Sequence, residues 1–173
     1  MTAIDKRFFR IFARFYGLIE MKRHVIIAIL LCAFFCGCRQ QEKNAELIHR
    51  DFYETLWERF DYVRNDVEIK EATTYDLGLR ISFTDKYAYD NISLVFTIFD
   101  SKGTPYRSRG YKFDLKDAEG QWKSELKDGC YTFELPINKS LQITEPGIYR
   151  FQIEYRMPIT PILGVKSLSL YNN

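Results

Sequence analysis

The stretch Tyr149-Arg-Phe-Gln-Ile-Glu-Tyr-Arg-Met157 alternates apolar and polar residues at every position. Successive side chains of a β-strand point to opposite faces, so this pattern predicts a strand with one buried face and one face in water. Such half-buried strands are typical of antiparallel sheets, because parallel sheets are covered on both faces. This strand is the clearest in the chain, and its neighbours must form a sheet with it.

The same period of two recurs through most of the chain. Apolar residues alternate with polar ones in the segments 77–83, 92–98, 111–115, 131–135 and 168–170. Turn-forming residues separate several of these segments, at 100–103, 117–120 and 145–147. We expect Pro136 to end the segment 131–135, because proline cannot donate a hydrogen bond to a sheet. Short strands with one apolar face bury it by packing sheet on sheet, so the sequence predicts an all-β antiparallel β-sandwich of about seven strands.

Residues 45–60 show a different spacing of apolar side chains. Ile48, Phe52, Leu56 and Phe60 recur at every fourth position, and Asn44 is of the residue type that caps helices. The spacing predicts one short amphipathic helix ahead of the sandwich, within a domain that spans residues 45–173.

The segment from Met21 to Cys38 has the layout of a bacterial lipoprotein signal peptide. Basic residues at 22–24 precede an apolar run, 25–35, of eleven residues, and Gly37 stands directly before Cys38. A spanning helix needs about 20 apolar residues, whereas a run of this length suits a signal peptide. We therefore expect cleavage before Cys38 and lipidation of its thiol. The alternatives are an uncleaved signal anchor or a buried apolar helix.

Residues 1–20 precede a signal peptide that is complete without them. They combine aromatic and basic residues, a pattern typical of a helix lying on a membrane surface. The simpler interpretation, which we adopt, is that translation begins at Met21. The expected organisation is an upstream extension and signal peptide over 1–37, a lipidated tether over 38–44, and the folded domain over 45–173.

The charge of the expected mature chain argues against nucleic acid as a partner. The full chain has a formal charge of +2, but residues 1–37 hold six of its 25 Lys and Arg and only two of its 23 Asp and Glu. Residues 38–173 therefore carry a charge of −2, without the excess of basic residues that nucleic-acid binding requires.

The cysteines and histidines offer little for metal binding or catalysis. Only Cys130 and His49 lie beyond Cys38, so the mature domain has no intramolecular disulfide and no His/Cys cluster for zinc. A nucleophilic pair of Cys130 and His49 is conceivable. The alternative, which we favour, is a buried strand cysteine and a surface histidine on the expected helix.

The order and spacing of several short motifs resemble the GldH family of gliding-motility lipoproteins from Bacteroidetes. The resemblance runs from about Trp57 to Leu170. Its most specific motif is Tyr87-Ala-Tyr-Asp-Asn91, which leads into an apolar strand. The other matching segments are 75–80, 103, 114–122, 147–151, 157 and 163–165.

This resemblance implies a lipid-anchored component of the gliding and type IX secretion machinery, without catalysis, cofactor or small-molecule substrate. The implied partners are other envelope proteins of that machinery and the membrane that holds the anchor. The implied location is the outer membrane, facing the periplasm. The short segment after Cys38, which lacks an acidic cluster, favours that orientation.

Four residues form the candidate interaction surface: Tyr87, Tyr89, Asn91 and Trp122. Aromatic residues on alternating strands are also typical of core or cross-strand pairs. Asp114, Asp117 and Glu119 could ligate calcium through oxygen, or could satisfy the amides of a turn. Arg80 could pair with a carboxylate in the sheet or point to water.

Two functions fit these patterns. The first is a non-enzymatic envelope lipoprotein that docks onto partner proteins. The second is a carbohydrate-binding or adhesive surface lipoprotein, for which Tyr106 and Tyr111 would extend the aromatic set. No phosphate-binding glycine loop and no nucleophile elbow occurs in the sequence.

Overall fold

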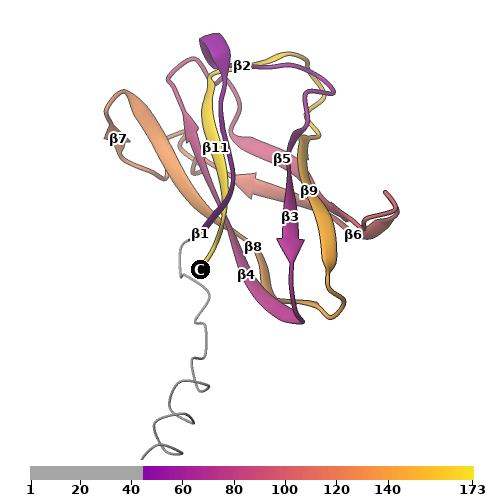
Figure 1. The fold of residues 1–173 in the computed structure, drawn as a ribbon. Coiled ribbons are helices and arrows are strands. Elements are labelled where there is room, and N and C mark those ends of the chain that lie inside the picture. The colour runs from indigo at the N-terminus through magenta and orange to yellow at the C-terminus, as the bar shows by residue number, and fades with distance from the viewer. Residues whose placement is uncertain (1–44) are drawn as a thin grey trace, which may run out of the picture. The chain divides into compact units, whose positions relative to one another are not determined.

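The computed structural model describes residues 45–173, which form one unit made almost entirely of strands (Figure 1). The expected signal peptide, Cys38 and the tether 38–44 lie outside the described residues. The long strands are β1 (Ala45–Asp51), β3 (Val63–Ile69), β4 (Thr73–Phe83), β5 (Asn91–Phe99), β6 (Pro105–Asp114), β8 (Cys130–Ile143), β9 (Gly147–Tyr155) and β11 (Val165–Asn172). The short elements are the 3-10 turn η1 (Tyr53–Thr55) and strands β2 (Leu56–Trp57), β7 (Leu126–Lys127) and β10 (Ile162–Leu163).

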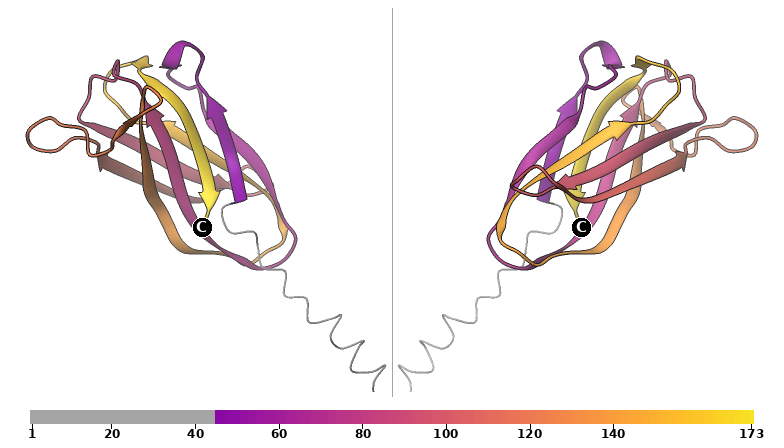
Figure 2. Two further views of the ribbon diagram at one scale, coloured as in Figure 1. Left: turned by 90° about the vertical axis from the view of Figure 1, so that its left-hand side faces the viewer. Right: turned by 90° about the vertical axis from the view of Figure 1, so that its right-hand side faces the viewer.

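Two antiparallel sheets pack face to face, as the alternation predicts. The five-stranded sheet has the order β1-β11-β4-β8-β7, and the four-stranded sheet has the order β3-β9-β5-β6. Strands β10 and β2 pair separately. Figure 2 shows the strands of the two layers crossing obliquely. The predicted antiparallel β-sandwich is confirmed, and no helix within residues 45–173 is long and apolar enough to cross a bilayer.

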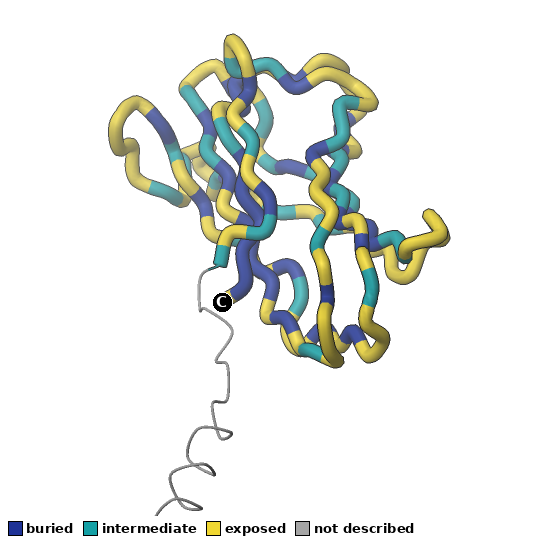
Figure 3. Tube along the Cα trace, in the orientation of Figure 1, coloured by how far each residue is buried: buried dark blue, intermediate teal, exposed yellow. Residues whose placement is uncertain are grey.

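The core lies between the sheets and consists of the alternating apolar residues of the central strands. Both sheets contribute buried side chains at every second position, namely Tyr75, Leu77, Leu79, Ile81, Phe83, Ile92, Leu94, Phe96, Ile98, Tyr149, Phe151, Ile153, Tyr155, Leu168 and Leu170. Figure 3 shows buried and exposed positions alternating along these strands. The period of two therefore assigns these residues to the correct face of each sheet.

The predicted helix over 45–60 is wrong. Residues 45–51 form β1, which pairs with β11, and residues 53–57 form η1 and β2. A spacing of four is an even number, so Ile48 and Phe52 also share one side of an extended chain, where both are buried. Glu54, Thr55 and Phe60 have φ of +50°, +60° and +66°, which no right-handed helix allows.

Pro136 does not end a strand, contrary to the prediction. Strand β8 continues through it to Ile143. Pro136 lies opposite Gly78, where the register between β4 and β8 shifts on either side of Leu77. A proline without an amide proton is tolerated at such a bulge, because the hydrogen-bond ladder is already interrupted there.

On one lateral side of the sandwich, a hydrogen bond joins the edge strands β1 and β3 of the two sheets. The side-chain amide of Asn65 donates to the carbonyl oxygen of Leu47 at 2.8 Å. Beside it, Arg150 of β9 donates to Asp66 of β3 through two atoms, and this hydrogen bond lowers the pKa of the Asp66 carboxyl. The other lateral side carries β6 and β7, the outermost strands of the two sheets.

Candidate docking surfaces

Three of the four residues of the candidate interaction surface belong to one group of rings. We call Phe83, Tyr87, Tyr89, Trp122, Tyr131 and Phe133 the aromatic cluster. Tyr87 contacts Phe83 at 4.4 Å, Tyr89 at 5.4 Å and Trp122 at 6.3 Å between ring centroids. Trp122 stacks on Tyr131 at 4.3 Å with the planes 10° apart. The cluster joins the loop after β4, the loop after β6 and the start of β8.

Most of the cluster supports the fold rather than facing solvent. Tyr87 is buried, and its hydroxyl donates to the carbonyl oxygen of Asn91 at 2.8 Å. Burial raises the pKa of Tyr87, so the phenol remains a neutral donor. Asn91 therefore contacts the aromatic cluster through its backbone carbonyl oxygen. Of the cluster, only the half-buried rings of Tyr89, Trp122 and Tyr131 reach the surface.

A cation covers the outer ring of the cluster. The ammonium of Lys116 lies 5.1 Å from the centre of the Trp122 ring and 3.2 Å from the Asp90 carboxylate. The rings thus stack on one another and under Lys116, instead of presenting an open flat platform to a sugar. This arrangement stabilises the loops that follow β4 and β6.

One of the acidic residues near the turn after β6, Asp117, satisfies backbone amides. Asp117 accepts hydrogen bonds from the amides of Glu119 at 3.1 Å and Gln121 at 2.8 Å. Within residues 45–173, no group of three His, Cys, Asp or Glu side chains is placed to hold a metal ion. The structure therefore matches the turn interpretation of Asp117.

Cys130 and His49 do not form a nucleophilic pair. Cys130 is buried at the start of β8, whereas His49 lies on β1, a strand and not a helix. Strands β11 and β4 separate β1 from β8. Three strand spacings correspond to about 14 Å, which is far beyond hydrogen-bond reach.

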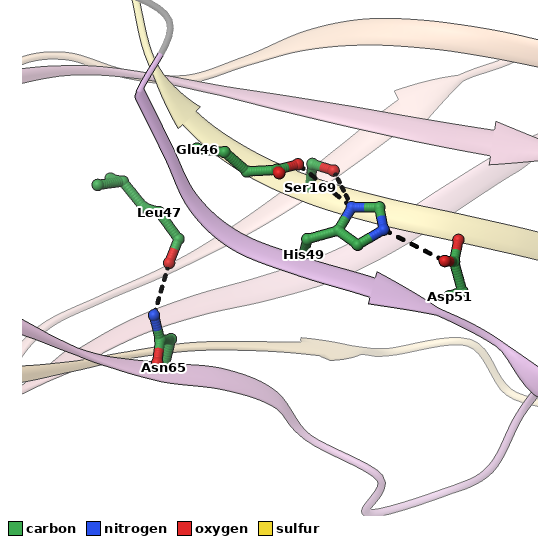
Figure 4. Close-up of polar contacts among 6 residues, drawn as sticks. All are labelled: Glu46, Leu47, His49, Asp51, Asn65 and Ser169. Carbon is green, nitrogen blue, oxygen red and sulfur yellow. Dashed lines mark hydrogen bonds and ion pairs between the residues drawn. The ribbon is translucent and has the colours of Figure 1, made fainter. Parts of the chain in front are cut away.

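His49 begins a line of polar residues across the outer face of the five-stranded sheet. The register places His49, Ser169, Arg80 and Glu134 side by side on β1, β11, β4 and β8, and we call them the polar row. The imidazole Nδ1 of His49 lies 2.8 Å from the Ser169 hydroxyl and 3.2 Å from the Glu46 carboxylate. Its Nε2 lies 3.3 Å from Asp51, as Figure 4 shows.

Arg80 both points to water and pairs with a carboxylate, the two alternatives that the sequence left open. It lies on the solvent-facing side of the sheet and donates to Glu134 at 2.8 Å and 3.2 Å. Its guanidinium also covers the Tyr171 ring at 5.2 Å, and the hydrogen bond to Glu134 raises the pKa of Arg80. The sequence spacing puts Arg80 on the polar face. It does not predict Glu134 as the partner, because that depends on the register between β4 and β8.

A group of exposed apolar side chains was missed in the sequence. Tyr53, Phe60, Ile159 and Leu163 have exposed fractions of 84%, 74%, 55% and 45%. Tyr53 lies in η1, Leu163 lies in β10, and Phe60 and Ile159 lie on the loops beside β2 and β10. These two strands pair with each other beyond the end of β1 (Figure 1). The helix predicted over residues 45–60 includes Phe60 in its apolar stripe, so the sequence pattern does not indicate that this side chain is exposed.

The comparisons with known proteins identify a family. The family model described as GldH lipoprotein matches residues 48–170. A comparison with curated proteins gave no match.

Solved structures resemble the chain only distantly. Dimeric latent PorU from Porphyromonas gingivalis matches 76% of this chain at 12% identity and a TM-score of 0.34. The VP2 subviral particle of infectious bursal disease virus matches 72% of it at 12% identity and a TM-score of 0.33. The chain covers 12% and 33% of those two proteins.

Proposed function

The chain belongs to the GldH lipoprotein family, and from this we propose that it is a lipid-anchored, non-catalytic envelope component of the gliding and type IX secretion machinery that acts by docking onto partner proteins. The family match over residues 48–170 is the observation that carries this proposal. It covers nearly the whole sandwich, so the family assignment concerns the folded domain itself.

The proposed anchor is a diacylglyceryl group on the thiol of Cys38. Residues 38–44 then form the only link between the lipid and β1, which begins at Ala45. An extended segment of that length spans at most about 25 Å. The sandwich therefore stays close to the bilayer, and we propose that it faces the periplasm from the outer membrane.

The arrangement of side chains supports docking over catalysis or sugar binding. In the sandwich, the candidate nucleophile Cys130 is buried and distant from His49, and the rings of the aromatic cluster stack on each other. Tyr53, Phe60, Ile159 and Leu163 in addition offer exposed apolar side chains to a partner protein.

Replacing Cys38 with alanine is expected to leave a soluble or unprocessed protein, because the acyl chains are the only firm anchor. Two or more acyl chains hold a protein stably, because each buried CH₂ contributes about 0.8 kcal/mol. Fractionation of cells by ultracentrifugation, with Cys130→Ala as the matched control, measures the effect. The control should stay with the membranes, and retention there of a Cys38→Ala protein that has lost its signal peptide would contradict the proposed anchor.

Protease treatment of intact cells separates docking inside the envelope from surface adhesion. We expect the domain to survive on intact cells and to be cut only after the outer membrane is permeabilised. Cleavage on intact cells would place the domain at the cell surface and favour the adhesive alternative. An immunoblot against the sandwich is the readout.

A further inference from the structure

Strand β6 is a long sheet edge that the described chain leaves uncovered. It spans ten residues and pairs only with β5 among the described strands. Its first six residues, Pro105–Gly110, are all exposed (Figure 3). Natural proteins keep free edges short or cover them, because a free edge can bind another strand. A ten-residue edge is therefore a feature that calls for a partner.

The hydrogen-bonding pattern identifies which backbone groups of β6 point outward. The amide of Leu115 donates to Asp90, and the amide of Arg156 donates to Ser93. Since directions alternate along each strand, even-numbered residues of β5 bond toward β6 and odd-numbered ones toward β9. The backbone groups of Ser108, Gly110 and Lys112 consequently point to the free edge.

The side chains beside this edge are mainly basic. Arg107 and Arg109 lie opposite the buried Ile98 and Phe96, so they stand on the core-facing side of β6, yet both are exposed. Neither makes an ion pair within residues 45–173, whereas Arg50, Arg80, Arg150 and Arg156 each pair with a carboxylate.

Further along the same side, the two arginines give way to aromatic residues. The Arg109 guanidinium lies 5.4 Å from the centre of the Tyr111 ring, and Tyr111 stacks with Phe113 at 5.9 Å. Both rings are half-buried. One side of the edge thus reads basic, basic, aromatic, aromatic at alternate positions.

This order of side chains disfavours a second copy of the chain as the partner. Antiparallel pairing of two β6 strands about Ser108 would place each Arg107 directly opposite an Arg109. Like charges directly opposite each other destabilise a strand pair, and inward-pointing charges are a known means of blocking edge pairing. A strand that carries carboxylates at those positions would instead be attracted.

We propose that the free edge of β6 binds an extended, acidic segment of a partner envelope protein as an added strand. The inference rests on the docking function proposed above and specifies the chemistry of the partner. Facing Arg107 and Arg109, the segment carries two carboxylates at alternate positions, and facing Tyr111 and Phe113 it carries two apolar residues. Main-chain hydrogen bonds to Ser108, Gly110 and Lys112 supply affinity, and the carboxylates supply specificity.

Synthetic peptides test the predicted pattern on the full-length protein in detergent. The probes are Val-Thr-Val-Thr-Glu-Thr-Glu for antiparallel addition and its reverse for parallel addition. The control peptides have Lys in place of Glu. We expect one Glu peptide to bind and to slow amide exchange at Ser108, Gly110 and Lys112 by about tenfold or more. Equal binding of the Lys peptides, or no protection of β6, would overturn the proposal.

Variants of β6 test the edge and the charges separately. Gly110→Pro removes an outward amide and fills the space beside it, whereas Gly110→Ala keeps the amide, and an added Cβ meets only the Leu94 oxygen at 4.0 Å. We expect the proline variant to lose peptide binding and the alanine variant to keep it, at similar thermal unfolding midpoints. The double variant Arg107→Glu with Arg109→Glu should bind the Glu peptide about tenfold more weakly or worse. The double variant Arg107→Lys with Arg109→Lys keeps both positive charges and should retain binding.

A parallel experiment in cells keeps a failure of this inference apart from a failure of docking. A photocrosslinking residue at Lys112 should give adducts that disappear with Gly110→Pro, while one at the exposed Phe60 reports on the apolar side chains around β2 and β10. Crosslinks from Phe60 without any from Lys112 would overturn the β6 inference and leave docking intact. Absence of both would contradict docking itself.

Discussion

The Phe151→Ala variant is expected to lose about 3–5 kcal/mol of stability, because it removes a fully buried ring from the middle of the sandwich. Phe151 has no exposed surface and makes edge-to-face contacts with Tyr75 at 6.0 Å and Phe96 at 5.8 Å. Tyr75 belongs to the five-stranded sheet and Phe96 to the four-stranded sheet, so the ring joins both layers. Chemical denaturation followed by tryptophan fluorescence measures the loss.

The matched control is Ile148→Ala on the same strand. Ile148 is 55% exposed, and its replacement should change stability by less than about 0.5 kcal/mol. If Phe151→Ala does not fold, Phe151→Leu keeps most of the volume and should cost about 1–2 kcal/mol. Similar losses for Phe151→Ala and Ile148→Ala would show that the faces of β9 are assigned incorrectly.

The Gly164→Ala variant is expected to lose about 3–4 kcal/mol, since its backbone conformation and its surroundings both exclude a Cβ. Gly164 has φ of +92°, and an added Cβ would lie 2.3 Å from the backbone nitrogen of Tyr87. Gly164 also donates to Thr55 and accepts from Thr84, so three segments meet at this residue. The clash is with backbone and cannot be relieved by rotating a side chain.

Gly103→Ala separates the two causes. Gly103 has φ of +78°, but nothing lies within 4 Å of an added Cβ. Its replacement should cost only the conformational part, about 1–2 kcal/mol, in the same thermal or chemical unfolding assay. Equal losses at the two glycines would mean that the loop containing Tyr87 moves away freely, against the packing described above.

Alternation predicted the central strands because burial on one face acts at every second residue. It succeeded for three strands in the middle of their sheets, β4, β5 and β9, but it ended β8 too early at Pro136. It missed β3, because the polar Asn65 interrupts the apolar positions Val63, Val67 and Ile69. An edge strand carries more polar residues, so its apolar period is weaker.

The error over residues 45–60 has a different origin. Apolar residues four apart are compatible with one face of a helix and with one face of a strand. What decides between them is the long-range pairing of β1 with β11, more than a hundred residues away in the chain. Local spacing of apolar residues does not predict this pairing. It also does not predict that Glu54, Thr55 and Phe60 adopt the left-handed backbone conformation that turns the chain.

The sequence predicted which aromatic residues of the candidate site come together, but not that most of them support the fold. The sequence grouped Tyr87, Tyr89 and Trp122, and these rings do come together. Their burial, however, depends on Phe83 and Tyr131, which reach the cluster through the pairing of β4 with β8. The polar row and the free edge of β6 likewise follow from strand order, which alternation alone does not specify.

The antiparallel pairing of β1 with β11 places Ala45 beside Asn172 (Figure 1). A reporter fused after Asn173 would therefore emerge close to Ala45, where, with the lipid anchor proposed at Cys38, a bilayer would hinder antibodies or large fusion partners. An epitope inserted at the exposed Tyr53 would project from the far end of β1. Labelling schemes for this domain should thus use the η1 loop and leave the carboxyl terminus free.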